Sequence, residues 1–407
     1  MPEGLSRRSY LKLAGAGSTV ALAGCRGLGG GGGGDGPIRI GSAVPLAGSL
    51  ASYGERAAPA VEFVKTQIGD TILDREYEVV TRDTQTAPET GLEVVRELVE
   101  EENVDALMGI SSSAVAIAVK EFITQEAQLP FVFENVSSAA IRENADYCNE
   151  YYFYPFTSSR QMALAHIDFI QNALPQEEPD VDTSSVAMIY ADYEAGQEAL
   201  SLFKSEFEAA GGEVSTEVPA PPGTTEFSNF LPQLQNADAD IVHAFLPGAQ
   251  GIQFASQSSD FGLKDQKTMV LSGDVLNQLS LGAIGSAADG MYGTHWYNSL
   301  NESEMNTAYK EWHTENRETP PNSLLASNVN MFYSLVQGIE EAGTVEAGDV
   351  ISAMEGMAFD SPFGQLTYRG SDHQTEQNFF GFAIEDGWYS SLSEYPDVIG
   401  PAECSFD

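Results

Sequence analysis

The sequence predicts an α/β protein made of two doubly wound parallel-sheet lobes. Segments with strand character alternate with segments of helical periodicity from Pro37 onward, which is typical of parallel sheets covered by helices on both faces. The alternation restarts after residues 151–154, so a second unit follows the first. With 407 residues, of which 42% are hydrophobic, the chain is long enough to give two units their own cores.

The individual elements follow from the spacing of apolar residues. The first unit has a strand at 38–44, a helix at 57–68, a strand at 77–80, a helix at 91–99, a strand at 105–110, a further helix and a strand at 130–133. The second unit has a helix at 160–172, a strand at 186–190, a helix at 197–210, a short strand at 213–214, a helix at 227–235, a strand at 240–245, a helix around 252–258 and a strand at 268–271. A last helix at 323–342 is apolar on all sides and is expected to pack back on the first unit.

This arrangement predicts a cleft between the two units. In open parallel sheets, ligands bind outside the carboxyl ends of the strands. Two units of similar size would face each other there and move about a hinge. A ligand held between them is the expected function of such a molecule.

Acidic residues dominate the composition. The chain has 60 Asp and Glu against 19 Lys and Arg, which gives a formal net charge of −41. Such a surface repels phosphate backbones and anionic lipid headgroups, so it excludes nucleic acid as a partner and a basic patch as a membrane anchor. Because the acids are spread along the whole chain, they indicate a protein that stays soluble in concentrated salt, from a halophile.

The first 36 residues are expected to lie outside the fold. Residues 1–24 have the features of a twin-arginine signal peptide, because Arg7 and Arg8 precede an apolar run at 13–23 that is shorter than the ~20 residues of a membrane span. The run ends in Leu-Ala-Gly-Cys, which resembles a lipobox and would leave Cys25 as a lipid-modified N-terminus. Residues 25–36 then form a glycine-rich tether. We therefore expect a lipid-anchored protein on the extracellular face of the cytoplasmic membrane.

Neither the cysteines nor the histidines predict catalysis. After Cys25 only Cys148 and Cys404 remain, and they are either one disulfide or two unpaired thiols. The five histidines show no H-E-x-x-H motif and no metal-ligand spacing, and the chain has no G-x-S-x-G elbow. Asp372-His373 could form an acid/base pair, but such pairs are common on protein surfaces. We expect no enzyme activity, no metal and no cofactor.

Several short motifs occur in a fixed order between residues 37 and about 390. They are Val44-Pro45-Leu46-Ala47-Gly48 leading to Tyr53-Gly54, Asp105-Ala106-Leu107-Met108-Gly109 leading to Ser111-Ser112-Ser113, Asp192-Tyr193-Glu194-Ala195-Gly196, and Ser371-Asp372-His373-Gln374. In this order the chain resembles the type I periplasmic binding proteins of the branched-chain amino acid and amide class, which are receptors that feed ABC importers.

The resemblance implies where the lobes and partners are. Lobe 1 would comprise residues 37–157 and 295–360, and lobe 2 residues 158–294 and 361–400, with three crossings at the hinge. The protein would be a monomer that captures a branched-chain or related amino acid and delivers it to ABC permease and ATPase subunits. A short amide, urea or a carboxylate is the alternative ligand, and an anchored ligand sensor is the alternative role.

Two serine-rich loops of lobe 1 are candidates for holding a carboxylate. Ser111 and Ser112 follow a strand and open a helix, where unpaired backbone N–H groups and hydroxyls attract an anion. Helix capping by itself would explain one of these serines. Asn135 and Ser137 repeat the arrangement after the next strand, and the resemblance gives Ser137 a bond to the ligand and Asn135 a backbone carbonyl contact. It also places Tyr53 over the ligand.

Lobe 2 is expected to bind the other end of the ligand. By resemblance, Asp274 pairs with an α-ammonium, the partner that a carboxylate in a closed cleft needs. Ala195 stands where the family often has tyrosine, so Tyr193 or Phe245 would form the side-chain wall instead. Trp296-Tyr297 is either a further wall near the hinge or part of the core.

Overall fold

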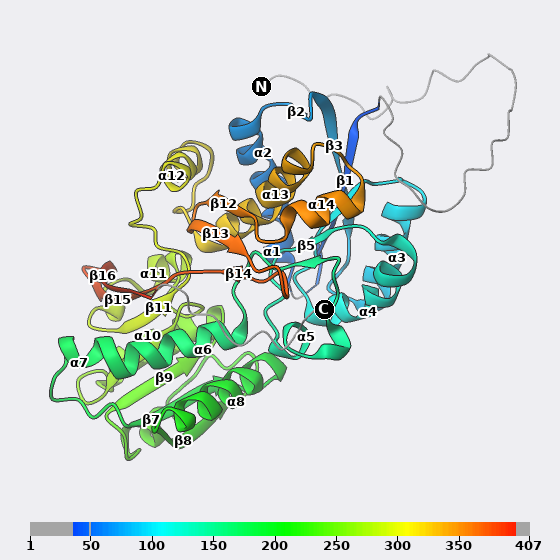
Figure 1. The fold of residues 1–407 in the computed structure, drawn as a ribbon. Helices are drawn as coiled ribbons and strands as arrows, with labels where there is room; N and C mark the ends of the chain where they lie inside the picture. The colour runs from blue at the N-terminus through cyan, green and yellow to red at the C-terminus, as the bar shows by residue number, and fades with distance from the viewer. Residues whose placement is uncertain (1–35, 49, 396–407) are drawn as a thin grey trace, which may run out of the picture.

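The computed structural model describes residues 36–48 and 50–395, which form two α/β lobes (Figure 1). The predicted signal peptide, almost all of the tether, Cys25 and Cys404 lie outside these residues. Cys148 is disulfide-bonded. Within the described ranges, no helix is both long enough and apolar enough to cross a membrane.

Lobe 1 is built on a six-stranded sheet with the order β2-β3-β1-β4-β5-β6. All neighbouring strands in it are parallel except β2 and β3. The strands are β1 (Ile38–Val44), β2 (Thr71–Ile72), β3 (Arg75–Asp83), β4 (Ala106–Gly109), β5 (Phe131–Phe133) and β6 (Tyr152–Phe153).

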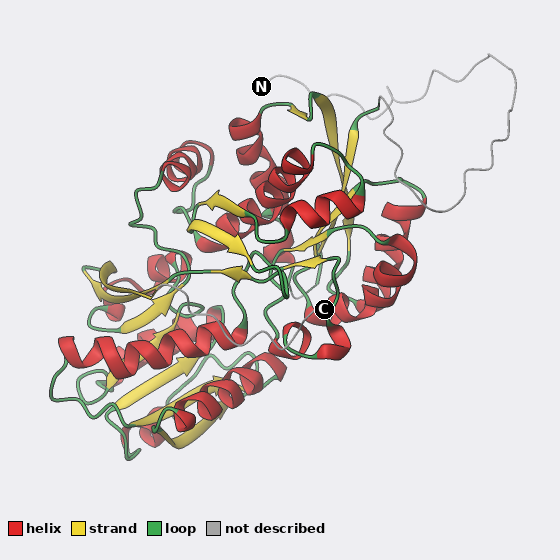
Figure 2. Ribbon diagram, viewed as in Figure 1, coloured by secondary structure: helices red, strands yellow, loops and turns green. Residues whose placement is uncertain are grey.

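Helices cover both faces of this sheet (Figure 2). Alternate residues of a strand point to opposite faces, so Ile38 and Ile40 of β1 enter one core and Ala43 the other. The first face is covered by α2 (Ala57–Ile68) and α13 (Ser323–Ala342), with α14 (Ala347–Met354) packed on α13 and α12 (Glu304–Asn316) nearby. The second face is covered by α3 (Pro88–Glu100) and α4 (Ser113–Phe122), which continues as a π-helix at Ile123–Ala127.

Lobe 2 is built on a seven-stranded sheet with the order β16-β15-β11-β10-β9-β7-β8. Its strands are β7 (Ser185–Ala191), β8 (Glu213–Ala220), β9 (Ile241–Phe245), β10 (Thr268–Ser272), β11 (Tyr292–His295), β15 (Phe379–Glu385) and β16 (Trp388–Tyr395), of which β15 runs antiparallel to both neighbours. One face is covered by α6 (Ser159–Asp168), α7 (Leu174–Glu177) and α8 (Glu194–Ala209), and the other by α9 (Leu231–Gln235), α10 (Ala249–Phe261) and α11 (Gln278–Ile284).

The sequence predictions for the second half are less complete than for the first. The helices at 57–68 and 323–342 are confirmed with the same limits. The short strand at 213–214 extends to Ala220, and the helix predicted at 227–235 is wrong in its first half. Pro232 explains the latter, because proline fits the first turn of a helix but not its interior, and α9 begins only at Leu231. The sequence pattern did not predict β11, α12 or the strands from β12 onward.

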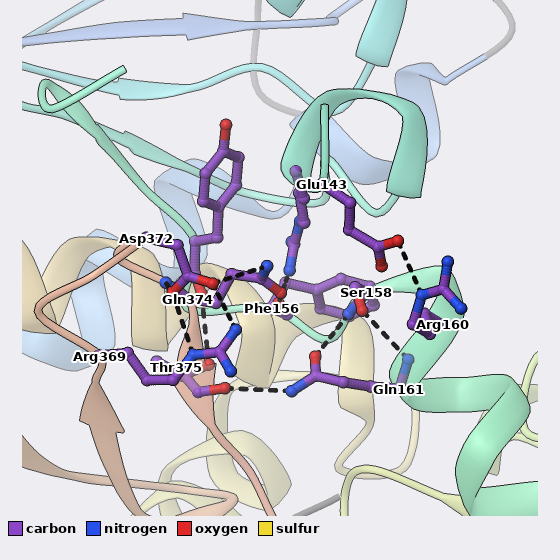
Figure 3. Close-up of polar contacts among 11 residues, drawn as sticks. Glu143, Phe156, Ser158, Arg160, Gln161, Arg369, Asp372, Gln374 and Thr375 are labelled. Atoms are coloured by element: carbon purple, nitrogen blue, oxygen red, sulfur yellow. Dashed lines mark hydrogen bonds and ion pairs between the residues drawn. The ribbon is translucent and has the colours of Figure 1, made fainter. Parts of the chain in front are cut away.

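The lobes are joined where the chain crosses between β6 and α6, between β11 and α12, and between β14 and β15. A third sheet of three strands lies beside these connections and spans the predicted lobe boundary at residues 360–361; its strands are β12 (Ala358–Ser361), β13 (Gly364–Tyr368) and β14 (Thr375–Glu376). The crossings are tied together, because Gln161 caps α6 with Ser158 and donates to the carbonyl oxygen of Thr375 at 3.2 Å (Figure 3).

The residues beside the hinge are buried rather than exposed. Trp296 and Tyr297 are 3% and 0% exposed, so the structure places both in the core. His373 stacks on Phe153 with ring centroids 4.1 Å apart, and Asp372 pairs with Arg369 instead of with His373. Asp372 and His373 are 2% and 0% exposed, so these two residues belong to the core and do not form a surface acid/base pair.

Candidate ligand-binding site

The predicted site residues lie at the carboxyl ends of parallel strands in both lobes. In lobe 1, Ser111 and Ser112 follow β4, Asn135 and Ser137 follow β5, and Tyr53 lies in the short helix α1 (Ala51–Gly54) after β1. In lobe 2, Tyr193 follows β7, Phe245 ends β9 and Asp274 follows β10. Parallel strands bring these ends to one edge of each sheet, which is why residues far apart in sequence share one region.

Tyr53 links the two sides electrostatically. Burial raises the pKa of Tyr53, the carboxylates of Asp274 and Glu134 raise it further, and Arg56 opposes them. Asp274 belongs to lobe 2, whereas Glu134 belongs to lobe 1. Groups influence one another in this way only at close range, so the Tyr53 hydroxyl lies within electrostatic range of one carboxylate from each lobe.

Asp274 is the carboxylate on the lobe 2 side. Burial raises the pKa of Asp274 to about 6, and no cation offsets this effect. Its carboxylate has no hydrogen bond or ion pair to any residue that the structure describes. Asp274 is half-buried, and an unpaired carboxylate in this position is stabilised by a bound cation or hydrogen-bond donor.

Glu134 is the carboxylate on the lobe 1 side, and the sequence analysis missed it. It is 1% exposed, accepts a hydrogen bond from the Ser111 hydroxyl, and accepts another from Asn328 Nδ2 of α13 at 2.7 Å. Burial raises the pKa of Glu134, while the bonds from Ser111 and Asn328 lower it. An acid directly after the apolar run 131–133 was the available signal, but in so acidic a chain it did not stand out.

The serine loops differ from one another in detail. Ser111 directs its hydroxyl at Glu134, so this group is not free to donate to a ligand. Ser112 is the N-cap residue of α4, but its side chain makes no capping bond, so helix capping does not explain this serine. Asn135 and Ser137 are half-buried, and the carbonyl oxygen of Ser137 accepts from the backbone N–H of Ser159 at 2.8 Å.

On lobe 2, Tyr193 and Phe245 flank Asp274. Tyr193 is the N-cap residue of α8 and is 41% exposed; partial burial and the Asp274 carboxylate raise its pKa. Phe245 and Asp274 both line a cavity of about 30 Å³ that extends into lobe 2. The structure thus brings Tyr53, Tyr193, Phe245 and Asp274 into one region.

Polar contacts join the lobes beside this region. Glu198 of α8 accepts a hydrogen bond from Ser138 Oγ of lobe 1 at 2.8 Å and another from Ser159 Oγ of its own lobe at 3.0 Å. Arg160 of α6 donates from Nε to Glu143, which follows α5 (Ala139–Arg142), at 2.7 Å (Figure 3). An open pocket of about 520 Å³ lies between α5 and α8 at these contacts. The lobes therefore touch on this side.

No metal centre is present among residues 36–48 and 50–395, where no group of three or more His, Cys, Asp and Glu side chains could hold an ion. The site consists of neutral donors, aromatic rings and carboxylates. Such a set suits reversible binding of a small polar molecule.

Comparisons with known proteins agree with this architecture. The model of a family described as periplasmic binding protein matches residues 37–387. A Leu/Ile/Val-binding protein homolog from Brucella melitensis is 25% identical over 363 residues, which cover 86% of this chain and 89% of that protein.

Solved structures have the same fold. An ABC transporter substrate-binding protein from Sphaerobacter thermophilus has a TM-score of 0.80 and 25% identity, covering 89% of this chain and 98% of its own. A solute-binding protein from Rhodopseudomonas palustris, in complex with 3,4-dihydroxybenzoic acid, has a TM-score of 0.78 and 24% identity, covering 90% of this chain and 99% of its own.

Proposed function

The chain belongs to the periplasmic binding protein family, and from this premise we propose that it captures a branched-chain or related amino acid between its lobes and delivers it to an ABC importer. The observation that carries the amino-acid part is Asp274, a half-buried carboxylate with a raised pKa and without a cation among the described residues. An α-ammonium group is the partner that would stabilise it. The protein acts by binding and release, not by catalysis.

The second carboxylate supports the same ligand charge. Glu134 and Asp274 both act on the Tyr53 hydroxyl, so the region between them is electronegative. At short range and reduced dielectric, like charges repel by several kcal/mol. This repulsion disfavours an anion beside Asp274 and favours a cationic group there. The loops at Ser112 and Ser137 carry no charged side chain at these positions and would bind the ligand carboxylate.

An aromatic carboxylate is the second candidate, because the similar Rhodopseudomonas palustris protein was solved with 3,4-dihydroxybenzoic acid. Such a ligand has the carboxylate that the serine loops would hold but lacks an ammonium group for Asp274. Native mass spectrometry of the protein released from its own host separates the two. A co-purified primary amine supports the proposal, and a ligand without an amine overturns it.

The proposed setting is the extracellular face of the cytoplasmic membrane of a halophile. It rests on the twin-arginine and lipobox patterns that end at Cys25 and on the net charge of −41. Cys25→Ser should leave the domain exported but released into the medium; a variant that stays on the membrane after signal cleavage contradicts the anchor. Raising KCl from dilute buffer to about 1 M, where the Debye length falls to ~3 Å, should raise the unfolding midpoint.

Its partners would be one permease pair and two ATPase subunits, with the binding protein as a monomer. The lobe boundaries at 157/158 and 294/295 are retained as part of this proposal, whereas the boundary expected at 360/361 is replaced by the crossing between β14 and β15. An anchored ligand sensor would use the same fold and cleft. Uptake of labelled ligand into cells that lack the gene, compared with wild type, distinguishes import from sensing.

A further inference from the structure

The cavity of about 30 Å³ in lobe 2 joins the cleft to a group of buried polar residues. Its lining contains Phe245 and Asp274 of the cleft together with His166, His243 and Ser272. The last three are each no more than 4% exposed. A cavity of this size has room for one small polar group, since a water needs about 10–15 Å³ by the same measure.

His166 lines this cavity with a neutral ring. Its Nδ1 lies 2.7 Å from the carbonyl oxygen of Met162, so Nδ1 must carry the proton and donate. Burial lowers the pKa of His166 to about 4, against hydrogen bonding to the Met162 and Leu271 carbonyls. The ring is therefore neutral at pH 7, and Nε2 is an acceptor that a carbonyl oxygen cannot satisfy.

His243 is held in the same tautomer. Its Nδ1 lies 2.8 Å from the carbonyl oxygen of Val270 and must donate to it. Burial lowers the pKa of His243 to about 3, and His166, whose ring centroid is 4.9 Å away, lowers it further. In both histidines Nδ1 is the donor, so Nε2 is a hydrogen-bond acceptor.

Two of these polar atoms have no partner. Within the described part of the chain, His166 Nε2 and Ser272 Oγ are buried and make no hydrogen bond. Buried polar atoms are rarely left in this state, and each one calls for a partner that the protein itself does not supply. Because His166 Nε2 and the Asp274 carboxylate are both acceptors, the missing partner must be a donor.

We propose that this cavity is a subsite for a hydrogen-bond donor on the ligand side chain, so that the bound amino acid has a short hydroxyl or primary amide side chain rather than a purely aliphatic one. This inference rests on the proposed function, because it takes the ligand to be an amino acid held by Asp274. It changes the expected substrates from aliphatic amino acids to amino acids with small polar side chains.

Titration calorimetry of the full chain with L-threonine and L-valine tests the subsite. The two are isosteric and differ in one hydroxyl group, so their affinity ratio isolates the side-chain donor. Threonine should bind about five- to tenfold more tightly than valine, the factor expected from one net hydrogen bond. L-Asparagine against L-leucine gives a second near-isosteric pair with an amide donor.

Two variants test whether the cavity residues cause the preference for threonine over valine. Ser272→Ala removes one hydroxyl group and His166→Phe removes both ring nitrogens, and each change should bring the threonine-to-valine affinity ratio toward one. Ser42→Ala is the matched control, because Ser42 of β1 is also a buried strand serine with an unpartnered hydroxyl but does not line the cavity. Its ratio should equal that of wild type.

The outcomes separate the two proposals. Equal affinities for threonine and valine, both weakened by Asp274→Ala, would overturn the subsite and leave the amino-acid receptor standing. A threonine preference that persists in both cavity variants would also overturn the subsite. Binding of neither amino acid, together with a co-purified ligand that has no amine, would overturn both.

Discussion

The two lobes present carboxylates to the cleft in opposite states. Glu134 of lobe 1 is 1% exposed and receives hydrogen bonds from Ser111 and Asn328 of its own lobe. Asp274 of lobe 2 has no such partner among the described residues, and burial raises its pKa to about 6. Lobe 1 therefore completes its hydrogen bonds without a ligand, whereas lobe 2 does not. From this difference we expect lobe 2, rather than lobe 1, to select the charge of the ligand.

The largest expected effect removes the lobe 2 carboxylate. Asp274→Ala should weaken binding of the co-purified ligand by about 3–5 kcal/mol, because the buried ammonium loses its partner. Asp274→Asn should cost less, since an amide oxygen still accepts a hydrogen bond. Titration calorimetry measures both, with Glu134→Gln as the lobe 1 control, expected to change affinity by less than about 1 kcal/mol. Equal losses at the two positions would remove the distinction between the lobes.

The relative effects of the Glu134 and Asp274 substitutions should reverse when stability is measured instead of affinity. Glu134→Ala should lower the free energy of unfolding by about 1–3 kcal/mol, because Ser111 and Asn328 lose their acceptor. Asp274→Ala should leave the unfolding free energy of the ligand-free protein unchanged or raise it, since it removes an unpaired, half-buried carboxylate. Urea unfolding in molar salt provides both values. A stability loss at Asp274 as large as that at Glu134 would show that Asp274 has a partner within the fold.

Substitutions in the serine loops of lobe 1 should have smaller effects on ligand binding than substitution of Asp274 in lobe 2. Ser112→Ala and Ser137→Ala should each weaken binding by about 1–2 kcal/mol, because backbone N–H groups would continue to hold the ligand carboxylate. Calorimetry with the co-purified ligand measures the loss. If either serine change abolished binding while Asp274→Ala had no effect, a neutral amide or a carboxylate would be the better ligand, and lobe 1 would be the selective side.

The pH dependence of binding should follow Asp274. Burial raises its pKa to about 6 in the ligand-free protein, so below pH 6 the ammonium must displace a proton and affinity should fall about tenfold per pH unit. From pH 7 to 8 this group adds no change. The stability of the ligand-free protein should change in the opposite direction. Between the ordinary pKa of an aspartate and about pH 6, the folded state binds more protons than the unfolded state, so the contribution of Asp274 to stability decreases as pH rises. Asp274→Asn should remove both dependences, and a pH profile retained in that variant assigns them elsewhere.

The smallest expected effect concerns the contact between the lobes. Glu198→Ala removes the acceptor of Ser138 and Ser159 and should favour an open form, weakening ligand binding by about 0.5–1 kcal/mol. Small-angle scattering of the ligand-free protein should then give a larger radius of gyration. Lys204→Ala is the control, because Lys204 lies on the same helix but pairs with Glu217 inside lobe 2. A radius that rises equally in both variants would mean that Glu198 does not hold the lobes together.

The sequence predicted the parallel part of both sheets well, because strands buried on both faces contain continuous apolar runs such as 131–133 and 186–189. It did not predict β15 or the third sheet. There the segments are short and antiparallel, and their pairing with distant strands such as β11 decides the structure. Local periodicity carries little information about such pairing.

The site was predicted unevenly for a similar reason. Ser112 was proposed from its place between a strand and a helix, whereas Ser137 and Asp274 were proposed from the family resemblance; the structure places the three residues after β4, β5 and β10. Glu134 was missed because one acid among 60 acidic residues carries no local signal of burial. His166 and His243 belong to different elements, and only the fold brings their rings to 4.9 Å. Spacing along the chain could not have paired them.

The position of α13 has a consequence for how the protein is made. This helix covers one face of the lobe 1 sheet, where Phe332 packs against Tyr77 with ring centroids 6.1 Å apart, yet it follows most of lobe 2 in the chain. During translation, β1 to β6 must wait while residues 154–322 are added, roughly 10–30 s at about 5–20 residues per second. Throughout that interval the nascent lobe 1 exposes an apolar sheet face. A truncated chain that ends before residue 323 should therefore aggregate or bind chaperones, even though it contains the complete six-stranded sheet.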